Sequence, residues 1–454
     1  MSDWLLIALT VLSAVVVAKL ILKKYNAIFV FFASGLVILM AASVLTGTPI
    51  LGKATLGNVA LDAFGFLTQT FKSSIAGIGS LIMVVTGYAT YMKHTQASTK
   101  LAYMATTHLG GIRNKYLILA AFYLTGMALK LVLTSQASLA VLMLATVFPV
   151  LMALGIRPIT GASVLALLCL DYGPNDGSSL FMSTVAKLNP VEMFLHYQAR
   201  VALCIILVTA VLIPVYYHYM DQKDAEEGHS PVKAPEPVSN PAVPGFYVLL
   251  PLIPLIIVFA DYFIPSTKID VITANFIGFA ITFLIEFIRR SDRAAIPQDM
   301  AVILKGMADV FVSVVSIIIS ASVFAQGIKI LGGITIFTNW ISGMQGAVLL
   351  IMIILTVITY LFAIIMGSGA APFFAFGPLT PAIAAKLGVP TMTILLPMEL
   401  ATSIGRASSP VCGALIAIAG TAGLEPIVLA KRTAPLLFVM LVVNIAASYF
   451  FTMM

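Results

Sequence analysis

The sequence predicts an all-α polytopic protein that crosses a membrane many times and consists of two related halves. Of its 454 residues, 60% are hydrophobic and 9% are charged, whereas about a quarter of the residues in a soluble protein are charged. Several apolar segments reach the roughly 20 residues that a helix needs to span a bilayer. A charged, proline-rich stretch at 221–244 separates the halves, and the apolar pattern restarts after it.

The first repeat is predicted to occupy residues 1–220. It contains, in order, scaffold helices within 4–92, an interfacial helix at 97–112, a re-entrant hairpin at 116–154, a broken helix at 159–186 and a helix at 190–219. The interfacial helix is predicted because basic residues recur along an amphipathic stretch. The hairpin and the broken helix are predicted because polar runs interrupt apolar segments, LTSQAS at 133–138 and DYGPNDG at 171–177.

The second repeat is predicted at residues 245–454, after a cytoplasmic linker at 221–244 that is too charged and proline-rich to pack into a core. It contains, in order, scaffold helices within 246–331, an uncharged interfacial stretch at 332–346, a hairpin at 348–387, a broken helix at 391–421 and a helix at 426–451. Landmarks recur in both halves at an offset of 232–236 residues: Thr134 with Gly367, Pro149 with Pro381, Gly155 with Gly388, and Pro190 with Pro426. Paired, interrupted hydrophobic segments of this kind are typical of the repeats of secondary transporters.

The two halves are predicted to be inverted relative to each other. A hairpin enters and leaves on one side, so each half has five true spans, an odd number. With both termini periplasmic and the linker cytoplasmic, most basic loop residues fall inside, as the positive-inside rule requires. Full spans in place of the hairpins would make the halves parallel. The contrast between the basic stretch at 93–115 and the uncharged stretch at 332–346 would then have no explanation.

The composition also argues against several functions. The formal net charge of +7 does not indicate nucleic-acid binding, because the basic residues lie in short loops. The three cysteines lie in apolar runs and are expected to be packing residues. The five histidines form no metal-like cluster, so no metal and no other cofactor is predicted. The first apolar run lacks a preceding basic region and is predicted to be a retained helix.

Four breaks in the apolar segments predict a ligand site inside the membrane. Non-helical backbone at this depth is tolerated only where it is buried in protein or lines a cavity, and its free N–H groups and nearby hydroxyls can bind an anion. The predicted substrate-binding residues of the first two breaks are Thr134, Ser135, Gln136, Ser138 and Asn175. Those of the last two breaks are Gly367, Ser368, Gly369, Thr402, Ser403, Arg406, Ser408 and Ser409.

Arg406 is the predicted partner of a substrate carboxylate. An Arg in so apolar a setting costs roughly 2.5 kcal/mol or more unless it is paired or hydrated. Its planar guanidinium can hold a carboxylate through two parallel hydrogen bonds. The alternative is a structural ion pair with Glu399 or Asp171. Lys130, one turn before the first break, is an additional cation candidate for a dianion.

Asp171, Asp176 and Glu399 are the acidic residues nearest the breaks. Acidic residues at membrane depth are candidates for coupling to H⁺ or Na⁺, and neighbouring hydroxyl and carbonyl oxygens suit a hard cation. The alternative is that the three acids only balance the charges of Arg406 and Lys130. The sequence is compatible with both interpretations.

Four strings, ATVFP at 145–149, IMGSGAAPF at 365–373, IGRASSP at 404–410 and LAKRTAP at 429–435, give the chain a family resemblance. It resembles the DcuC family of anaerobic C4-dicarboxylate carriers, within the ion transporter superfamily. The resemblance implies transport of succinate, fumarate and malate across the bacterial inner membrane, by antiport or by cation or proton symport. It also implies a homodimer and an elevator mechanism, in which a block of hairpins and broken helices moves against a scaffold.

The sequence departs from that family's pattern in the walls of the predicted site. The second break lacks the Pro-Thr-Ser-Gly run associated with succinate carriers, Lys130 replaces a small polar residue, and Ala370 stands where close relatives have Asn. The alternative function is therefore transport of a different or larger organic anion. An anion channel would need a continuous polar stripe. An enzyme would need a nucleophile–base pair or metal ligands, so the protein is not expected to be an enzyme.

Overall fold

The computed structural model of this protein describes residues 3–23, 25–107, 114–136, 139–140, 142–143, 147–226, 240–264, 269–333, 336 and 347–453. Every regular element among these residues is helical, which confirms the predicted all-α class. Eight of the helices described are long and apolar enough to cross a membrane. They are Asp3–Ile21, Ala27–Thr46, Val59–His94, Pro190–Asp224, Val271–Arg289, Arg293–Leu331, Ala347–Met366 and Pro426–Met453.

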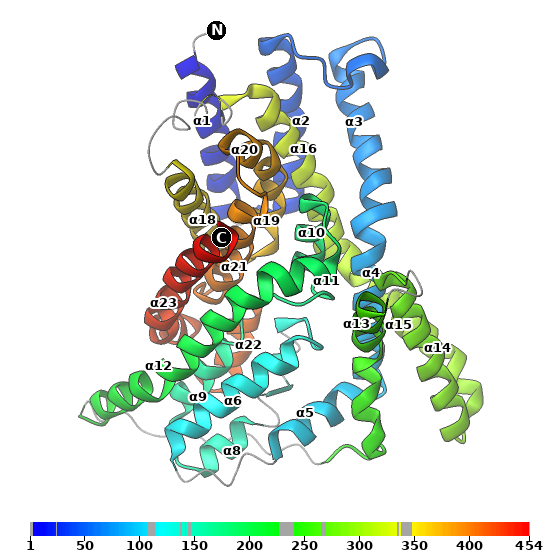
Figure 1. Ribbon diagram of the computed structural model, residues 1–454, viewed down its shortest axis with the longest axis vertical. Helices are drawn as coiled ribbons and strands as arrows, with labels where there is room; N and C mark the ends of the chain where they lie inside the picture. The colour runs from blue at the N-terminus through cyan, green and yellow to red at the C-terminus, as the bar shows by residue number, and fades with distance from the viewer. Residues whose placement is uncertain are drawn as a thin grey trace.

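The first half of the chain runs from α1 and α2, near the N-terminus, to α5, α6, α8 and α9 at the opposite end of the molecule (Figure 1). Its helices are α1 (Asp3–Leu22), α2 (Ala27–Thr46), α3 (Val59–Ser74), α4 (Ser80–His94), α5 (Ala97–Thr107), α6 (Lys115–Lys130), α8 (Phe148–Ala153), α9 (Pro158–Ala166), α10 (Gly177–Ala186), α11 (Pro190–Met193) and α12 (Ala199–Glu226). Asparagine side chains at 26, 58 and 114 accept hydrogen bonds from the first turns of α2, α3 and α6. These caps explain where the three helices begin.

The second half begins with a 3₁₀ segment, Gly245–Leu252, which contains Pro251. Its helices are α13 (Ile253–Phe263), α14 (Val271–Arg289), α15 (Asp299–Val310), α16 (Ser316–Leu331), α18 (Ala347–Met366), α19 (Ala370–Phe376), α20 (Thr380–Leu387), α21 (Met392–Ala407), α22 (Gly413–Thr421) and α23 (Pro426–Met453). Asp270 caps α14 by accepting a hydrogen bond from Thr273 N. The chain leaves helical geometry between α18 and α19 and again between α21 and α22.

Two long helices cross each other, and each is interrupted by a π-helical segment near its middle. A π-helical segment, Ile75–Gly79, joins α3 to α4, and a second, Phe311–Val315, joins α15 to α16. The two segments start 236 residues apart. They touch, since a Cβ built on Gly79 would lie 3.0 Å from Val315 Cγ1. Because α4 packs on α15 and α3 packs on α16, the two long helices are antiparallel.

Glycines allow α2 and α16 to approach closely. A Cβ on Gly35 would lie 2.7 Å from the backbone nitrogen of Phe324 on α16. A Cβ on Gly327 would lie 3.0 Å from the backbone nitrogen of Leu39 on α2. Small residues at such contacts are the usual way for membrane helices to gain packing without a hydrophobic driving force.

The linker begins later than the sequence predicts. Helix α12 continues to Glu226, so the first charged residues assigned to a linker at 221–244 are helical. The reason is that Asp221 and Asp224 form ion pairs with Arg432 of α23, whose Nη2 lies 3.1 and 2.9 Å from their carboxylate oxygens. Residues 227–239 lie outside the described part of the chain.

The stretch predicted as an interfacial helix at 97–112 is helical as α5 up to Thr107, and the residues after it lie outside the described part. Its Lys100 does not lie on an open polar face, because the residue is only 8% exposed. Its ammonium donates to Asn240 Oδ1 at 2.7 Å and to Pro241 O at 3.2 Å. Most of the predicted counterpart at 332–346 lies outside the described residues.

Candidate functional site

The candidate site is built around α21, an almost completely buried helix. Every residue of α21 is buried except Arg406, and the helix packs against α10, α18, α19 and α23. A helix enclosed on all sides is expected to be apolar all round. The polar residues of α21, Thr393, Glu399, Thr402, Ser403 and Arg406, are therefore the exceptions that call for an explanation.

Arg406 points from the last turn of α21 to the connection between α9 and α10. Its Nη2 atom lies 2.9 Å from each carboxylate oxygen of Asp171 and 3.2 Å from the carbonyl oxygen of Cys169. The predicted alternative, a pair with Asp171, is thus present in the structure. The pair does not use all of the guanidinium, because Arg406 Nε is buried and has no hydrogen-bond partner among the described residues.

Lys130, the last residue of α6, contacts the same carboxylate. Its side chain is fully buried. Its ammonium donates to Asp171 Oδ1 at 3.0 Å and to the carbonyl oxygen of Thr134. One carboxylate therefore contacts two cations; Asp171 and Arg406 lie in the second and fourth predicted breaks, and Lys130 lies one turn before the first. We call Lys130, Asp171 and Arg406 the charged triad.

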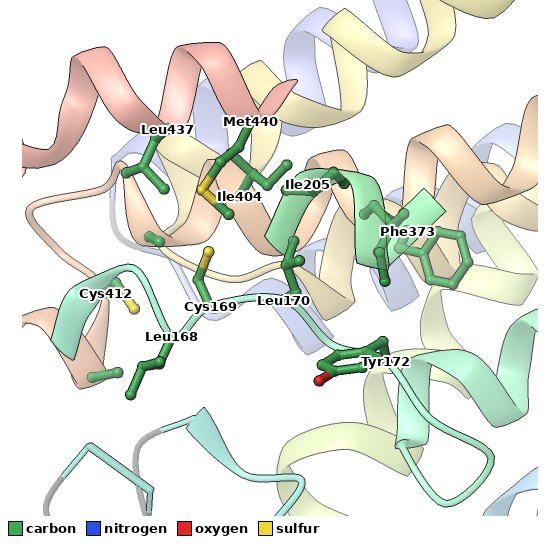
Figure 2. Packing of buried hydrophobic residues seen from close by; sticks show 14 of the residues in the cluster. Leu168, Cys169, Leu170, Tyr172, Ile205, Phe373, Ile404, Cys412, Leu437 and Met440 are labelled. Atoms are coloured by element: carbon green, nitrogen blue, oxygen red, sulfur yellow. The ribbon is translucent and has the colours of Figure 1, made fainter. Parts of the chain in front are cut away.

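The connection between α9 and α10 holds Asp171 in an apolar setting. Figure 2 shows Cys169 and Leu170 on this connection, with Ile404 of α21 and Met440 of α23 nearby. Tyr172 anchors the connection to α6, because its hydroxyl donates to Met127 O at 2.5 Å. Opposite charges attract more strongly in such surroundings than in water. The triad is thus both well defined and costly to disrupt.

The connection turns sharply at Gly173. Its φ angle is +114°, a conformation that side-chain-bearing residues rarely adopt. A Cβ there would also approach Leu131 Cδ2 to 3.3 Å, so the first and second breaks lie against each other. The N–H group of Gly173 is held by Gln198 Oε1 at 3.0 Å.

Gln198 links the second break to Glu399, and sequence reasoning missed it. Its Nε2 donates to Ser179 Oγ at 2.8 Å and to Glu399 Oε2 at 3.3 Å. Glu399 is fully buried, and its other oxygen, Oε1, has no partner in the described part of the chain. The available signal was a Gln in the helix predicted at 190–219, two residues before Arg200.

Asp176 has a structural task in this arrangement. Its carboxylate caps α10 by accepting hydrogen bonds from Ser178 N at 2.9 Å and Ser179 N at 3.1 Å. Two nearby predicted site residues are unsatisfied, because Asn175 Oδ1 and Gln136 Oε1 are buried without a partner among the described residues. Buried acceptors of this kind are usually satisfied by protein, water or an ion. These two oxygens are available to coordinate a cation.

The third and fourth breaks also lie against each other. Gly367 has a φ of +64°, and a Cβ there would come within 3.0 Å of the backbone of Val411. A Cβ on Gly369 would lie 3.0 Å from the carbonyl oxygen of Thr402. The described contacts thus join the first break to the second, the second to the fourth, and the fourth to the third.

Several predicted hydroxyl groups bond locally. Thr402 Oγ1 donates to Glu399 O at 2.7 Å, and Ser403 Oγ donates to Leu400 O at 2.9 Å. Ser408 Oγ lies 3.2 Å from Tyr360 Oη, and Ser409 Oγ accepts a hydrogen bond from Val411 N at 3.4 Å. Of the remaining predicted positions, Ser135 is exposed, and Thr134 and Ser368 are half-buried. Ser138 lies outside the described residues. In the described contacts, the carboxylate of Asp171 is therefore held by Lys130 and Arg406 rather than by these hydroxyl groups.

A sequence model of DcuC, described as a C4-dicarboxylate anaerobic carrier, matches residues 5–452. This match covers nearly the whole chain. The chain belongs to the DcuC family. The resemblance seen in the sequence motifs is thereby confirmed. Since the relatives of this DcuC chain are named as transporters, the protein is a transporter and not an enzyme.

Two relatives carry the name anaerobic C4-dicarboxylate transporter DcuC. The Escherichia coli K12 and Shigella flexneri proteins are each 30% identical to this chain over 437 residues, which covers 95% of this chain and 94% of theirs. A Vibrio cholerae relative is 31% identical over 435 residues, 94% of both chains. The similarity therefore extends through both halves of this DcuC chain.

Among solved structures, the chain is similar to the YdaH transporter of Alcanivorax borkumensis, with a TM-score of 0.56 and 13% identity. The alignment covers 93% of this chain and 97% of that one. At this identity the similarity supports the fold alone. The DcuC chain thus shares its architecture with a transporter.

Gly405, next to Arg406, offers a steric test of the site. A Cβ there would lie 2.5 Å from the carbonyl oxygen of Tyr360 on α18. We expect Gly405→Ala to push α21 from α18 and to destabilise the protein by about 1–3 kcal/mol. Thermal unfolding of the purified protein in detergent would measure this. Gly420→Ala is the control, since a Cβ at Gly420 meets nothing within 4 Å; equal stability of the two variants would contradict the expectation.

Proposed function

We propose that this protein is a secondary active transporter of C4-dicarboxylates such as succinate, fumarate and malate in the bacterial inner membrane. The supporting observation is the charged triad, in which Lys130 and Arg406 converge on one carboxylate. Two cations match the double negative charge of a dicarboxylate. Cations at membrane depth are expensive and usually mark a substrate pathway.

Arg406 is the proposed main carboxylate ligand, because its Nε is still without a partner in the described part of the structure. Lys130 is the proposed second cation. The proposed binding site also includes the predicted positions at the four breaks. Contacts join the first break to the second, the second to the fourth, and the fourth to the third. Closure of the breaks around the ligand would remove both partners from water, which is favourable only if their charges are matched.

The proposed mechanism is alternating access of the elevator type, with two inverted repeats. The antiparallel crossing of two long helices at π segments 236 residues apart supports such a repeat, because that offset equals the one between Pro190 and Pro426. We further propose that both termini are periplasmic, that the linker is cytoplasmic, and that the carrier is a homodimer. The first two proposals rest on the positive-inside rule, and the third rests on the family resemblance.

The second candidate function is transport of a different or larger organic anion. It is favoured by the DYGPNDG run of the second break, which contributes Asp171 directly to the triad. An anion channel is less well supported. A channel would need a continuous polar stripe or a ring of charges, whereas in the described residues Lys130 and Arg406 are both paired with Asp171.

Uptake of labelled succinate into proteoliposomes tests the proposal. Internal dicarboxylate, a Na⁺ gradient and a pH gradient would be imposed separately. We expect saturable uptake that internal dicarboxylate accelerates, because a carrier alternates between two faces. A reconstituted protein that neither binds nor moves succinate, fumarate or malate would refute the proposal. Flux without counter-flow would indicate a channel.

Glu399 is the proposed coupling residue among the three acids, with Asp171 and Asp176 engaged by the triad and by the cap of α10. Glu399→Gln keeps the shape and removes the charge. If Glu399 holds the coupling cation, H⁺ or Na⁺, the variant should lose most of the stimulation by an imposed ion gradient and retain exchange. If Glu399 only balances the triad's charge, gradient-driven uptake and exchange should change by the same factor. The ratio of the two rates distinguishes these outcomes.

A further inference from the structure

The charged triad contains a carboxylate where a substrate carboxylate is expected. We propose that Asp171 is an internal counter-ion, which occupies the carboxylate position of the site while no substrate is bound and yields it when a dicarboxylate enters. This inference deepens the proposed function and rests on it. It assigns to Asp171 a role different from coupling to a cation and different from holding Arg406 in place.

The geometry supports this assignment. Asp171 uses Oδ1 for both Lys130 and Arg406, and its Oδ2 also lies 2.9 Å from Arg406 Nη2. Lys130 is completely buried, and its ammonium also donates to an uncharged acceptor, the carbonyl oxygen of Thr134. In the described part of the chain, Asp171 is the acidic side chain within ion-pair distance of either cation.

Asp171 also belongs to a segment that is not part of a helix. It lies in the non-helical connection between α9 and α10, next to the positive-φ turn at Gly173. A carboxylate on such a connection can leave its partners by a change in a few backbone angles, whereas one within a helix would have to move the helix. A substrate carboxylate could then take the same two donors.

An internal counter-ion has a consequence for the transport cycle. A carrier that returns without cargo must close over its empty site. Leaving the fully buried Lys130 and the largely buried Arg406 unpaired would make that closure very unfavourable. With Asp171 in place the cations remain paired, so the empty carrier can return. Without Asp171, only a loaded carrier can change sides readily, and the protein becomes an exchanger.

The experiment compares net uptake with exchange in proteoliposomes for wild type and Asp171→Asn. Net uptake is measured without internal dicarboxylate, and exchange is measured with internal succinate. We expect Asp171→Asn to lower net uptake more than exchange, so that the ratio of net uptake to exchange falls at least about tenfold. Succinate-induced thermal stabilisation should become stronger in this variant, because the competing internal carboxylate is gone.

Two further variants keep the test decisive if Asp171→Asn does not fold. Asp171→Glu retains a carboxylate and should retain net uptake. Lys130→Gln leaves one cation for one carboxylate, so succinate should bind more weakly without any fall in the ratio of net uptake to exchange. A fall in that ratio for Lys130→Gln would overturn the inference.

Different results would refute the internal counter-ion and the proposed transport function. Equal losses of exchange and net uptake in Asp171→Asn, with weaker succinate binding, would show that Asp171 only positions Arg406. Wild-type protein that exchanges succinate but gives no net uptake would also overturn the inference and leave the proposed function intact. Absence of any dicarboxylate binding or transport by wild type would refute the proposed function itself.

Discussion

Replacing Arg406 by Ala should abolish measurable dicarboxylate transport. The substitution removes the guanidinium that contacts Asp171 and Cys169 O, together with the unused Nε donor that we assign to substrate. Loss of one partner of a desolvated, hydrogen-bonded charge pair costs about 2–5 kcal/mol of binding free energy. Succinate uptake and succinate-induced thermal stabilisation of the purified variant would measure the loss.

Two controls separate this effect from general damage. Arg406→Lys keeps the charge and loses the planar fork, so its transport should be intermediate. Arg200→Ala removes an Arg that is exposed on α12, and its transport should equal that of wild type. Transport by Arg406→Ala at the wild-type rate would show that this guanidinium is a structural partner of Asp171 and no more.

The helical breaks could be located from sequence because they violate the surrounding pattern. Polar and small residues interrupted segments otherwise long enough to span a membrane, and the structure leaves helical geometry after Lys130, after Ala166 and after Ala407. The types of residue at the breaks also indicated an anion. Features that are local in sequence, such as an Arg in an apolar helix, could therefore be recognised from the sequence.

Contacts between the breaks could not be read in the same way. Arg406 and Asp171 are 235 residues apart, and sequence reasoning left three roles open for Asp171. Gln198 was missed because one amide in an apolar helix gives no sign of its partners. Which polar atoms meet depends on how α6, α12 and α21 pack, and side-chain packing is decided by the whole core rather than by local periodicity.

The end of α12 also shows that contacts between distant segments cannot be read from the sequence. Asp221 and Asp224 belong to a charged run that composition alone assigns to a solvated linker. In the structure they lie against Arg432, and Asp221 also accepts a hydrogen bond from the Thr160 hydroxyl of α9. A basic partner more than 200 residues away converts apparent linker residues into part of the fold. We call Arg432, Asp221 and Asp224 the α12–α23 cluster.

Arg432→Ala should therefore destabilise the protein strongly without changing its substrate. The side chain is 4% exposed, and its removal leaves two acidic residues with much reduced compensation. Breaking a buried ion pair from one side costs about 3–5 kcal/mol. Arg157, at 3.7 Å from Asp224, can compensate only one of the two. Thermal unfolding in detergent would measure the loss, with the exposed neighbour Lys431→Ala as the matched control.

A double variant tests whether the loss arises from the unpaired charge. Adding Asp221→Asn to Arg432→Ala removes the more deeply buried of the two carboxylates, so part of the stability should return. If the double variant is as unstable as the sum of the single ones, packing by the Arg432 side chain is the cause instead. The folded fraction should still bind succinate, because the α12–α23 cluster shares no residue with the charged triad. This separates the two arginines: Arg432 acts on how much carrier is folded, whereas Arg406 acts on what the folded carrier can bind.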